Sequence, residues 1–246
     1  MPVYRGLISS DWSECLSPNG PFDFMAYVYP QLESDLAEIF QQYTGNQISL
    51  RVAMWRCQRR LPAPISQDQM DAYLDERFAH YTGVPELIEA CLSRNILFMI
   101  NTTGSRGYFE RAIAKNLLPR PTALSAHPEI RFDPGSNSYA YYALHEITDK
   151  PVNTAKAAKQ FQIAPQNIIV VGDSGGDGPH FKWAAAQGAY RIASMAKASL
   201  KAYCKRYQIE IHRFFGLSYG AGEPRQETAE MQVDFNNLMH YIEECL

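Results

Sequence analysis

The sequence has few cysteines, and they are not arranged in a way that would build a structure. Its 246 residues include five cysteines, an odd number, with no Cys-x-x-Cys pair. Disulfide-stabilised small proteins and structural zinc sites need paired or clustered cysteines, so both classes are excluded. Reduced thiols are typical of the cytosol, and we expect a cytoplasmic protein. The cysteines are Cys15, Cys57, Cys91, Cys204 and Cys245.

The sequence also lacks a long hydrophobic run and a strong charge of either sign. No apolar segment approaches the roughly 18 residues that a membrane-spanning helix needs, and the start, MPVYRGLISSDW, has no cationic and apolar export signal. A net charge of −3 argues against a broad nucleic-acid-binding surface. We therefore expect no membrane or nucleic-acid partner, while the oligomeric state stays open.

Short apolar runs separated by helical segments indicate an α/β fold. Residues 96–100 and 168–171 are continuous apolar runs of strand length, and residues 3–9 and 189–193 are two further candidate strands. Segments whose apolar residues have helical spacing lie between the later runs. Buried strands that alternate with helices are typical of a parallel sheet covered on both faces.

The stretch from about residue 21 to residue 92 reads as almost wholly helical. Leu36, Phe40 and Tyr43 recur at helical spacing, and Ser66 and Gln69 form a capping box. We therefore predict a Rossmann-like, doubly wound parallel sheet as the core, with an all-helical cap inserted after the first strand. The predicted core comprises residues 1–18 and 93–246, and the predicted cap comprises residues 19–92.

Polar side chains follow three of the predicted strands. Asp11 follows the first, Thr102 the second and Asp173 the third. The carboxyl ends of parallel strands are where open α/β sheets bind ligands. One such residue alone would indicate only a turn, but three of them, with Lys150 ahead of the third, favour a functional site.

These residues lie in motifs that resemble those of the haloacid dehalogenase-like (HAD) hydrolase superfamily. Residues 11–16, DWSECL, resemble the first motif, DxDGTL, and residues 172–177, GDSGGD, match the fourth motif, GDxxxD. Thr102 lies at the second-motif position, with Thr103 as an alternative. Lys150 lies 23 residues before Asp173, where many members have a lysine. The stretch VPELIEACLSRNILFMINTTG is similar to the phosphoserine-phosphatase-like branch, which carries a helical cap.

The resemblance implies a Mg²⁺-dependent phosphatase. Asp11 would attack phosphorus and form an aspartyl-phosphate, while Lys150 would neutralise negative charge. Oxygen ligands suit Mg²⁺, and the implied metal site comprises Asp11, the backbone carbonyl of Ser13, Asp173, and Asp177 as a ligand or as the partner of one. The implied phosphate-binding residues are Thr102 or Thr103, Gly104 and Lys150.

The predicted insert occupies the position of the family's cap, which closes over the site and selects substrates. A capped site admits small molecules better than polymers, so we expect a small phosphorylated metabolite as substrate. Arg56, together with Arg59 and Arg60, is a candidate for binding an anionic group of that substrate. A solvated basic face of a helix explains the same pattern.

Ser13 is the main departure from the family pattern. Phosphatases of the family have an Asp at this position, which protonates the leaving alcohol and later activates water. Serine has no acidic pKa near 7, so Ser13 joins Asp11 and Lys150 as a position that decides catalysis. The alternative is a module that binds phosphate and Mg²⁺ with lost or altered turnover. The adjacent Glu14 is a candidate replacement for the acid.

A third alternative is an enzyme that cleaves a bond other than a phosphate ester through Asp11. The DWS sequence resembles phosphonoacetaldehyde hydrolases, but these need a cap lysine, and this chain has no lysine before Lys115. Haloacid dehalogenases work without metal, and the paired Asp173 and Asp177 argue against that chemistry.

Overall fold

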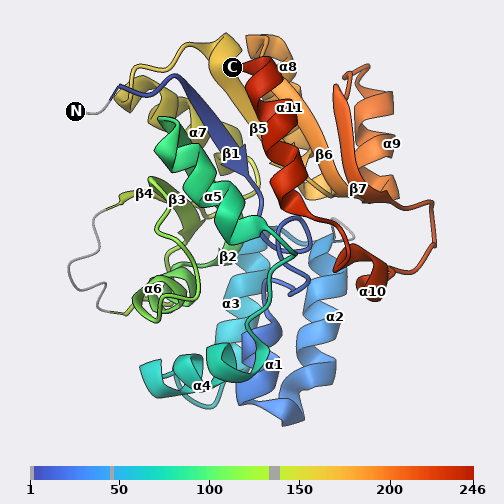
Figure 1. Ribbon diagram of the computed structural model, residues 1–246. Coiled ribbons are helices and arrows are strands. Elements are labelled where there is room, and N and C mark those ends of the chain that lie inside the picture. Colours follow the sequence, from blue (N-terminus) through green and yellow to red (C-terminus); the bar gives the residue numbers. More distant parts are fainter. Residues whose placement is uncertain (1–2, 45–46, 133–138) are drawn as a thin grey trace.

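The computed structural model describes residues 3–44, 47–132 and 139–246 (Figure 1). In this part of the chain, all strands are parallel and form one sheet in the order β4-β3-β2-β1-β5-β6-β7. The strands are β1 (Gly6–Ser10), β2 (Ile96–Ser105), β3 (Ala123–His127), β4 (Ala140–Ala143), β5 (Ile168–Gly172), β6 (Tyr190–Ala196) and β7 (Arg213–Ser218). The predicted doubly wound α/β fold is confirmed.

The central strands β2 and β5 begin with the continuous apolar runs of the sequence, residues 96–100 and 168–171, and β1 lies between them. Every residue of β1, β2 and β5 is buried, because both faces of the sheet are covered. Leu7 of β1 lies beside Leu97 of β2 and Ile168 of β5. β3, β4 and β7 were not predicted, since they are short or only partly buried and do not read as apolar runs.

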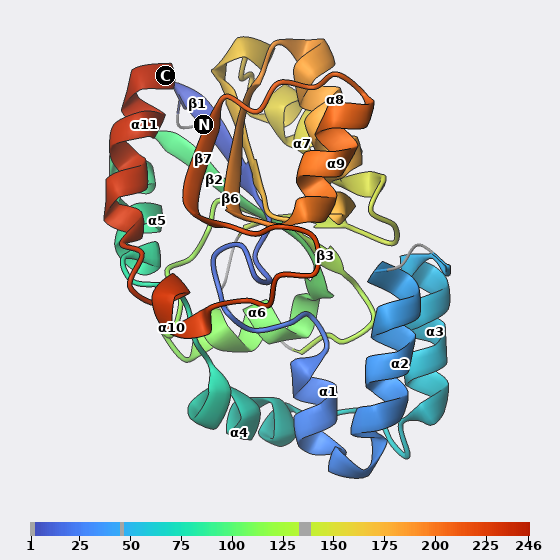
Figure 2. The same cartoon turned by 90° about the vertical axis from the view of Figure 1, so that its right-hand side faces the viewer.

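Helices cover both faces of the sheet (Figure 2). Successive strand residues point to opposite faces, so that Leu7 and Ile8 belong to two separate hydrophobic clusters. The cluster of Leu7 includes side chains from α7 (Asp149–Gln160), α8 (Gly178–Gln187) and α9 (Ala198–Arg206). The cluster of Ile8 includes side chains from α5 (Val84–Ser93), α6 (Arg106–Ala114) and α11 (Leu238–Cys245). Among the described residues, no helix is both long enough and apolar enough to cross a membrane.

Four helices between β1 and β2 form a separate layer beyond the carboxyl ends of the strands (Figure 1). Ser66 and Gln69 form the predicted capping box at the start of the fourth. The next helix, α5, lies within the range 19–92 but packs against β2 and α11. The four helices are α1 (Asp23–Val28), α2 (Glu33–Thr44), α3 (Leu50–Arg60) and α4 (Gln67–Arg77), and the short α10 (Glu227–Glu230) lies near the C-terminus.

Candidate active site

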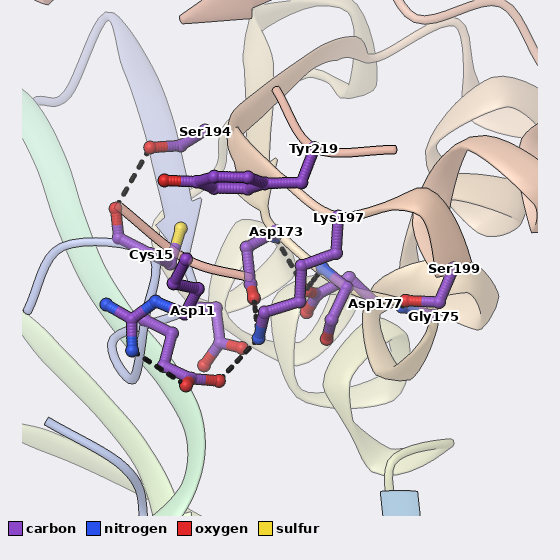
Figure 3. A network of polar contacts seen from close by, with 12 residues as sticks. Asp11, Cys15, Asp173, Gly175, Asp177, Ser194, Lys197, Ser199 and Tyr219 are labelled. Carbon is purple, nitrogen blue, oxygen red and sulfur yellow. Dashed lines mark hydrogen bonds and ion pairs between the residues drawn. The ribbon is translucent and has the colours of Figure 1, made fainter. Parts of the chain in front are cut away.

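Two carboxylates lie at the carboxyl ends of adjacent central strands. Asp11 follows β1 and Asp173 follows β5, and the Asp11 N–H donates to the carbonyl of Val171 at 3.0 Å. Because the two strands are parallel neighbours, both side chains reach the same edge of the sheet. Carboxylate oxygens of Asp11, Asp173 and Asp177 all lie within 4.8 Å of one another, and all three residues are buried (Figure 3).

Lys150 supplies a positive charge between two of these carboxylates. Its Nζ lies 2.9 Å from Asp11 Oδ2 and 2.6 Å from Asp177 Oδ1, and the side chain is almost fully buried. The first turn of α7 is held in place from the sheet, since Asn101 Nδ2 donates to the Lys150 carbonyl at 2.9 Å. Thr154 Oγ1 donates to the same carbonyl at 3.0 Å. Sequence reasoning missed Asn101, because a polar residue inside a buried strand gave no motif.

Asp177 organises the loop that carries Asp173. Its Oδ2 accepts from the backbone N–H of Asp173 at 3.0 Å and of Ser174 at 3.2 Å, while Oδ1 accepts from Lys150. The side chain folds back over Gly172, where an added Cβ would lie 2.5 Å from Asp177 Cγ. Glycine is therefore required at this position of the motif.

Lys197 adds a second positive charge, which sequence reasoning did not identify. It follows β6 and places Nζ 2.7 Å from Asp173 Oδ2 (Figure 3). The same ammonium contacts Glu14, whose other carboxylate oxygen lies 2.9 Å from Arg225 Nη1. The sequence feature that could have identified Lys197 is its position shortly after a predicted strand, residues 189–193. The resemblance, however, assigns no role to this position.

Glu14 is anchored from the C-terminal part of the chain. Its backbone adopts a left-handed conformation with φ of 57°. Its partner Arg225 also pairs with Glu230, which is fully buried and accepts from the hydroxyls of Tyr81 and Tyr219 at 2.7 Å each. Glu14 therefore faces the site as part of a connected ionic network.

The electrostatics of the site favour the binding of a cation. Burial raises the pKa of Asp173 to about 8, against the effect of Lys197, and the nearby Asp177 and Asp11 raise it further. Burial also raises the pKa of Asp11, although Lys150 opposes this shift. Three buried carboxylates in contact with only two ammonium groups are short of positive charge. An all-oxygen donor set of this kind fits a hard divalent cation such as Mg²⁺.

These groups open into one cavity of about 170 Å³ between the sheet and α2. The predicted site residues Asp11, Ser13, Thr103, Lys150 and Asp173 line it. The remaining lining residues come from the strand-end loops and from the helical layer, and are Glu14, Pro21, Phe40, Tyr43, Thr44, Ile147, Ser174, Gly175, Gly176, Lys197 and Ser199.

Three predicted phosphate- or substrate-binding residues are not brought to this cavity. Thr102 is fully buried, and its Oγ1 accepts from the Gly104 N–H at 3.2 Å, so Thr103 is the threonine that faces the site. Gly104 lines a smaller neighbouring pocket. Arg56 donates to Gln42 at 2.5 Å in a separate pocket of the helical layer, where this contact joins α3 to α2.

Solved structures share this fold over almost the whole chain. A phosphoserine phosphatase, a phospho-aspartyl intermediate analogue, matches with a TM-score of 0.67 at 16% identity, over 97% of this chain and 99% of that one. A substrate-bound phosphoserine phosphatase matches with a TM-score of 0.65 at 15% identity, over 96% and 98% of the two chains. A HAD family hydrolase from Salmonella enterica subsp. enterica serovar Typhi matches with a TM-score of 0.68 at 18% identity, over 100% and 74%. No family model and no curated protein matches the sequence.

Proposed function

We propose that this chain, which has the fold of the haloacid dehalogenase-like hydrolases in the form seen in phosphoserine phosphatases, is a Mg²⁺-dependent phosphatase. The observation that carries the proposal is the position of the Asp11 carboxylate. It faces the cavity beside the buried Lys150 and lies at the same edge of the sheet as Asp173. A carboxylate held next to a fixed ammonium is suited to receive a phosphoryl group. The substrate would be a small phosphorylated metabolite.

Asp11 acts as the nucleophile in the proposed reaction. Its carboxylate attacks phosphorus, the bond to the alcohol oxygen breaks, and the aspartyl-phosphate formed is then hydrolysed by water. The Asp11 side chain is oriented by the Trp12 N–H, which donates to Oδ1 at 2.7 Å. Lys150 and Thr103 bind the phosphoryl oxygens, since both line the cavity next to Asp11.

Asp11, Asp173 and the backbone carbonyl of Ser13 would hold Mg²⁺, with Asp177 fixing the loop of Asp173. When bound, Mg²⁺ supplies positive charge that offsets the repulsion between Asp11 and the phosphate. The donor set described above supports this assignment.

The helices α1 to α4 are proposed to form the cap, because α2 contributes the roof of the cavity. A lid of this kind excludes water during phosphoryl transfer and restricts the site to small substrates. The five cysteines are free, which supports the cytoplasmic location that we also propose.

Because Ser13 stands where phosphatases of the family have an Asp, the leaving alcohol lacks the usual acid. This favours a slow enzyme or a binding module as the second candidate function. Glu14 lines the cavity, but its carboxylate is paired with Lys197 and Arg225. Both of its oxygens are engaged in these ion pairs, so neither is free to contact the leaving alcohol. Proton transfer contributes about 10² to 10⁴ in rate, so we expect turnover slower than in members that have the second Asp.

The test is a panel of phosphorylated metabolites, assayed for phosphate release with and without Mg²⁺. We expect Mg²⁺-dependent release that Asp11→Asn abolishes, while Asp68→Asn, on the exposed face of α4, leaves it unchanged. Release that survives in Asp11→Asn would refute the assignment of the nucleophile. Binding of Mg²⁺ and inorganic phosphate without any release would favour the binding module.

A further inference from the structure

The charged side chains on the floor of the cavity are already paired. Asp11 lies 2.9 Å from Lys150, and Asp173 lies 2.7 Å from Lys197. Lys150 is shared further with Asp177, at 2.6 Å. The ammonium groups of Lys150 and Lys197 can still donate hydrogen bonds to a bound phosphate, but neither is free to pair with a second anionic group of the substrate.

Glu14, the other acidic residue lining the cavity, is paired as well. One of its carboxylate oxygens contacts Lys197, and the other lies 2.9 Å from Arg225. Both oxygens are thus occupied by cations of the protein. Among the described lining residues, the uncompensated negative charge lies at Asp11 and Asp173, where Mg²⁺ is proposed to bind, and no other acidic side chain is left to bind an ammonium group of a substrate.

The cap side of the cavity carries no charge at all among the described residues. It is lined by Pro21, Phe40, Tyr43 and Thr44. The rings of Phe40 and Tyr43 lie 6.5 Å apart, and both contact Phe22. The ring faces present an apolar surface, while the Tyr43 hydroxyl hydrogen-bonds the Thr103 side chain.

From this charge pattern we propose that the substrate is the phosphate ester of an uncharged alcohol with an apolar or ring-shaped face, and not an amino acid phosphate. The inference rests on the phosphatase function proposed above. The phosphate binds at the charged floor, and the alcohol part packs under Phe40 and Tyr43. A charged amino acid part would lose its hydration without gaining a partner, which is unfavourable.

The size of the cavity restricts the substrate to a small molecule. Its volume of about 170 Å³ has to hold both the phosphate and the part of the alcohol nearest to it. Thr44, at the end of α2, is exposed and lies at the margin of the cavity. It is therefore the position at which a new charge would face the alcohol part.

The test compares benzyl phosphate with phosphoserine, two phosphate esters of primary alcohols that differ in the charge of the alcohol part. We expect kcat/KM for benzyl phosphate to exceed that for phosphoserine by about tenfold or more, mainly through a lower KM. Equal or better use of phosphoserine would overturn this inference while leaving the phosphatase function intact. Hydrolysis of neither ester, nor of any phosphate in the panel, would overturn both.

Two substitutions on α2 test the role of the roof. Thr44→Arg should raise kcat/KM for phosphoserine and lower it for benzyl phosphate, whereas Gln41→Arg adds the same charge to an exposed part of the helix outside the cavity and should change neither. Phe40→Leu keeps an apolar side chain in the cap and should raise KM for benzyl phosphate several-fold. An unchanged substrate ratio in both Thr44→Arg and Phe40→Leu would contradict the inference.

Discussion

The ammonium of Lys150 lies 2.9 Å from the carboxylate of Asp11, and both side chains are buried at the edge of the sheet. The pair joins the end of the first strand to the start of α7, far apart in the sequence. Asp177 accepts from the same ammonium at 2.6 Å. The site is thus preorganised by ion pairs that also stabilise the fold.

Lys150→Met tests how much this ion pair contributes to the stability of the fold. The substitution leaves Asp11 and Asp177 buried without their cation, and we expect the free energy of unfolding at neutral pH to fall by about 3 kcal/mol. Urea denaturation measures the loss. In the control Lys115→Met, the lysine removed pairs with the exposed Asp75, and the loss should stay below about 1 kcal/mol. Equal losses in the two variants would contradict the prediction.

Asp173→Asn should abolish stabilisation by Mg²⁺. The wild-type melting temperature should rise with Mg²⁺, because a ligand at 100 times its Kd stabilises the folded state by about 2.7 kcal/mol. Without Mg²⁺ the variant should be at least as stable as the wild type, since burial raises the pKa of Asp173 to about 8 and makes its charge unfavourable. Differential scanning calorimetry in Mg²⁺ and in EDTA measures both effects.

Asp68→Asn, on the exposed face of α4, is the matched control for Asp173→Asn. It should keep the full response to Mg²⁺. An undiminished Mg²⁺ shift in Asp173→Asn would rule out this residue as a ligand.

His180 should make the fold sensitive to acid. Burial lowers its pKa to about 3, below the usual value of 6.5, with Lys150 as a further cause, and Thr154 hydrogen-bonds it at 2.9 Å. The unfolded chain therefore binds a proton that the folded chain does not, and the stability present above pH 6.5 falls as the pH drops toward 3. One proton corresponds to about 1.4 kcal/mol per pH unit.

His180→Gln should reduce the slope of unfolding free energy against pH by up to that amount between pH 6 and about 4, as followed by urea denaturation. The control His240→Gln replaces a histidine whose side chain is 74% exposed, and it should change the slope less than His180→Gln. An identical slope for His180→Gln and wild type would show that His180 is not held neutral in the fold.

Gly172→Ala should disturb the site by displacing the side chain of Asp177. The added Cβ would lie 2.5 Å from Asp177 Cγ and push this side chain away from Lys150 and from the N–H of Asp173. We expect a loss of about 1–3 kcal/mol in stability, together with a smaller Mg²⁺ shift. Gly104→Ala is the control, because its nearest neighbour would lie at an ordinary 3.5 Å. Normal Mg²⁺ binding in Gly172→Ala would argue against the positioning role of Asp177.

The sequence alone was sufficient to predict the central strands and the groups at their ends. Short continuous apolar runs are typical of strands in a sheet covered on both faces, which explains why β2 and β5 were predicted and the edge strands β4 and β7 were not. Asp11 and Asp173 could be predicted to lie together, since parallel neighbouring strands end at one edge. The motif spacing was enough to add Lys150 and Asp177.

Only the tertiary structure decided how these groups are partnered. Lys197 and Arg225 meet Glu14 through contacts between distant segments, which no local pattern encodes. The same holds for Thr103 replacing Thr102 in the cavity, because neighbouring residues of a strand point to opposite faces and the pairing of β2 with β3 shifts register in this region. Arg56 carries a charge suited to a substrate, but the packing of α3 on α2 directs it away from the site. Residue type and spacing determine which chemistry is available, whereas the packing of side chains determines which groups meet.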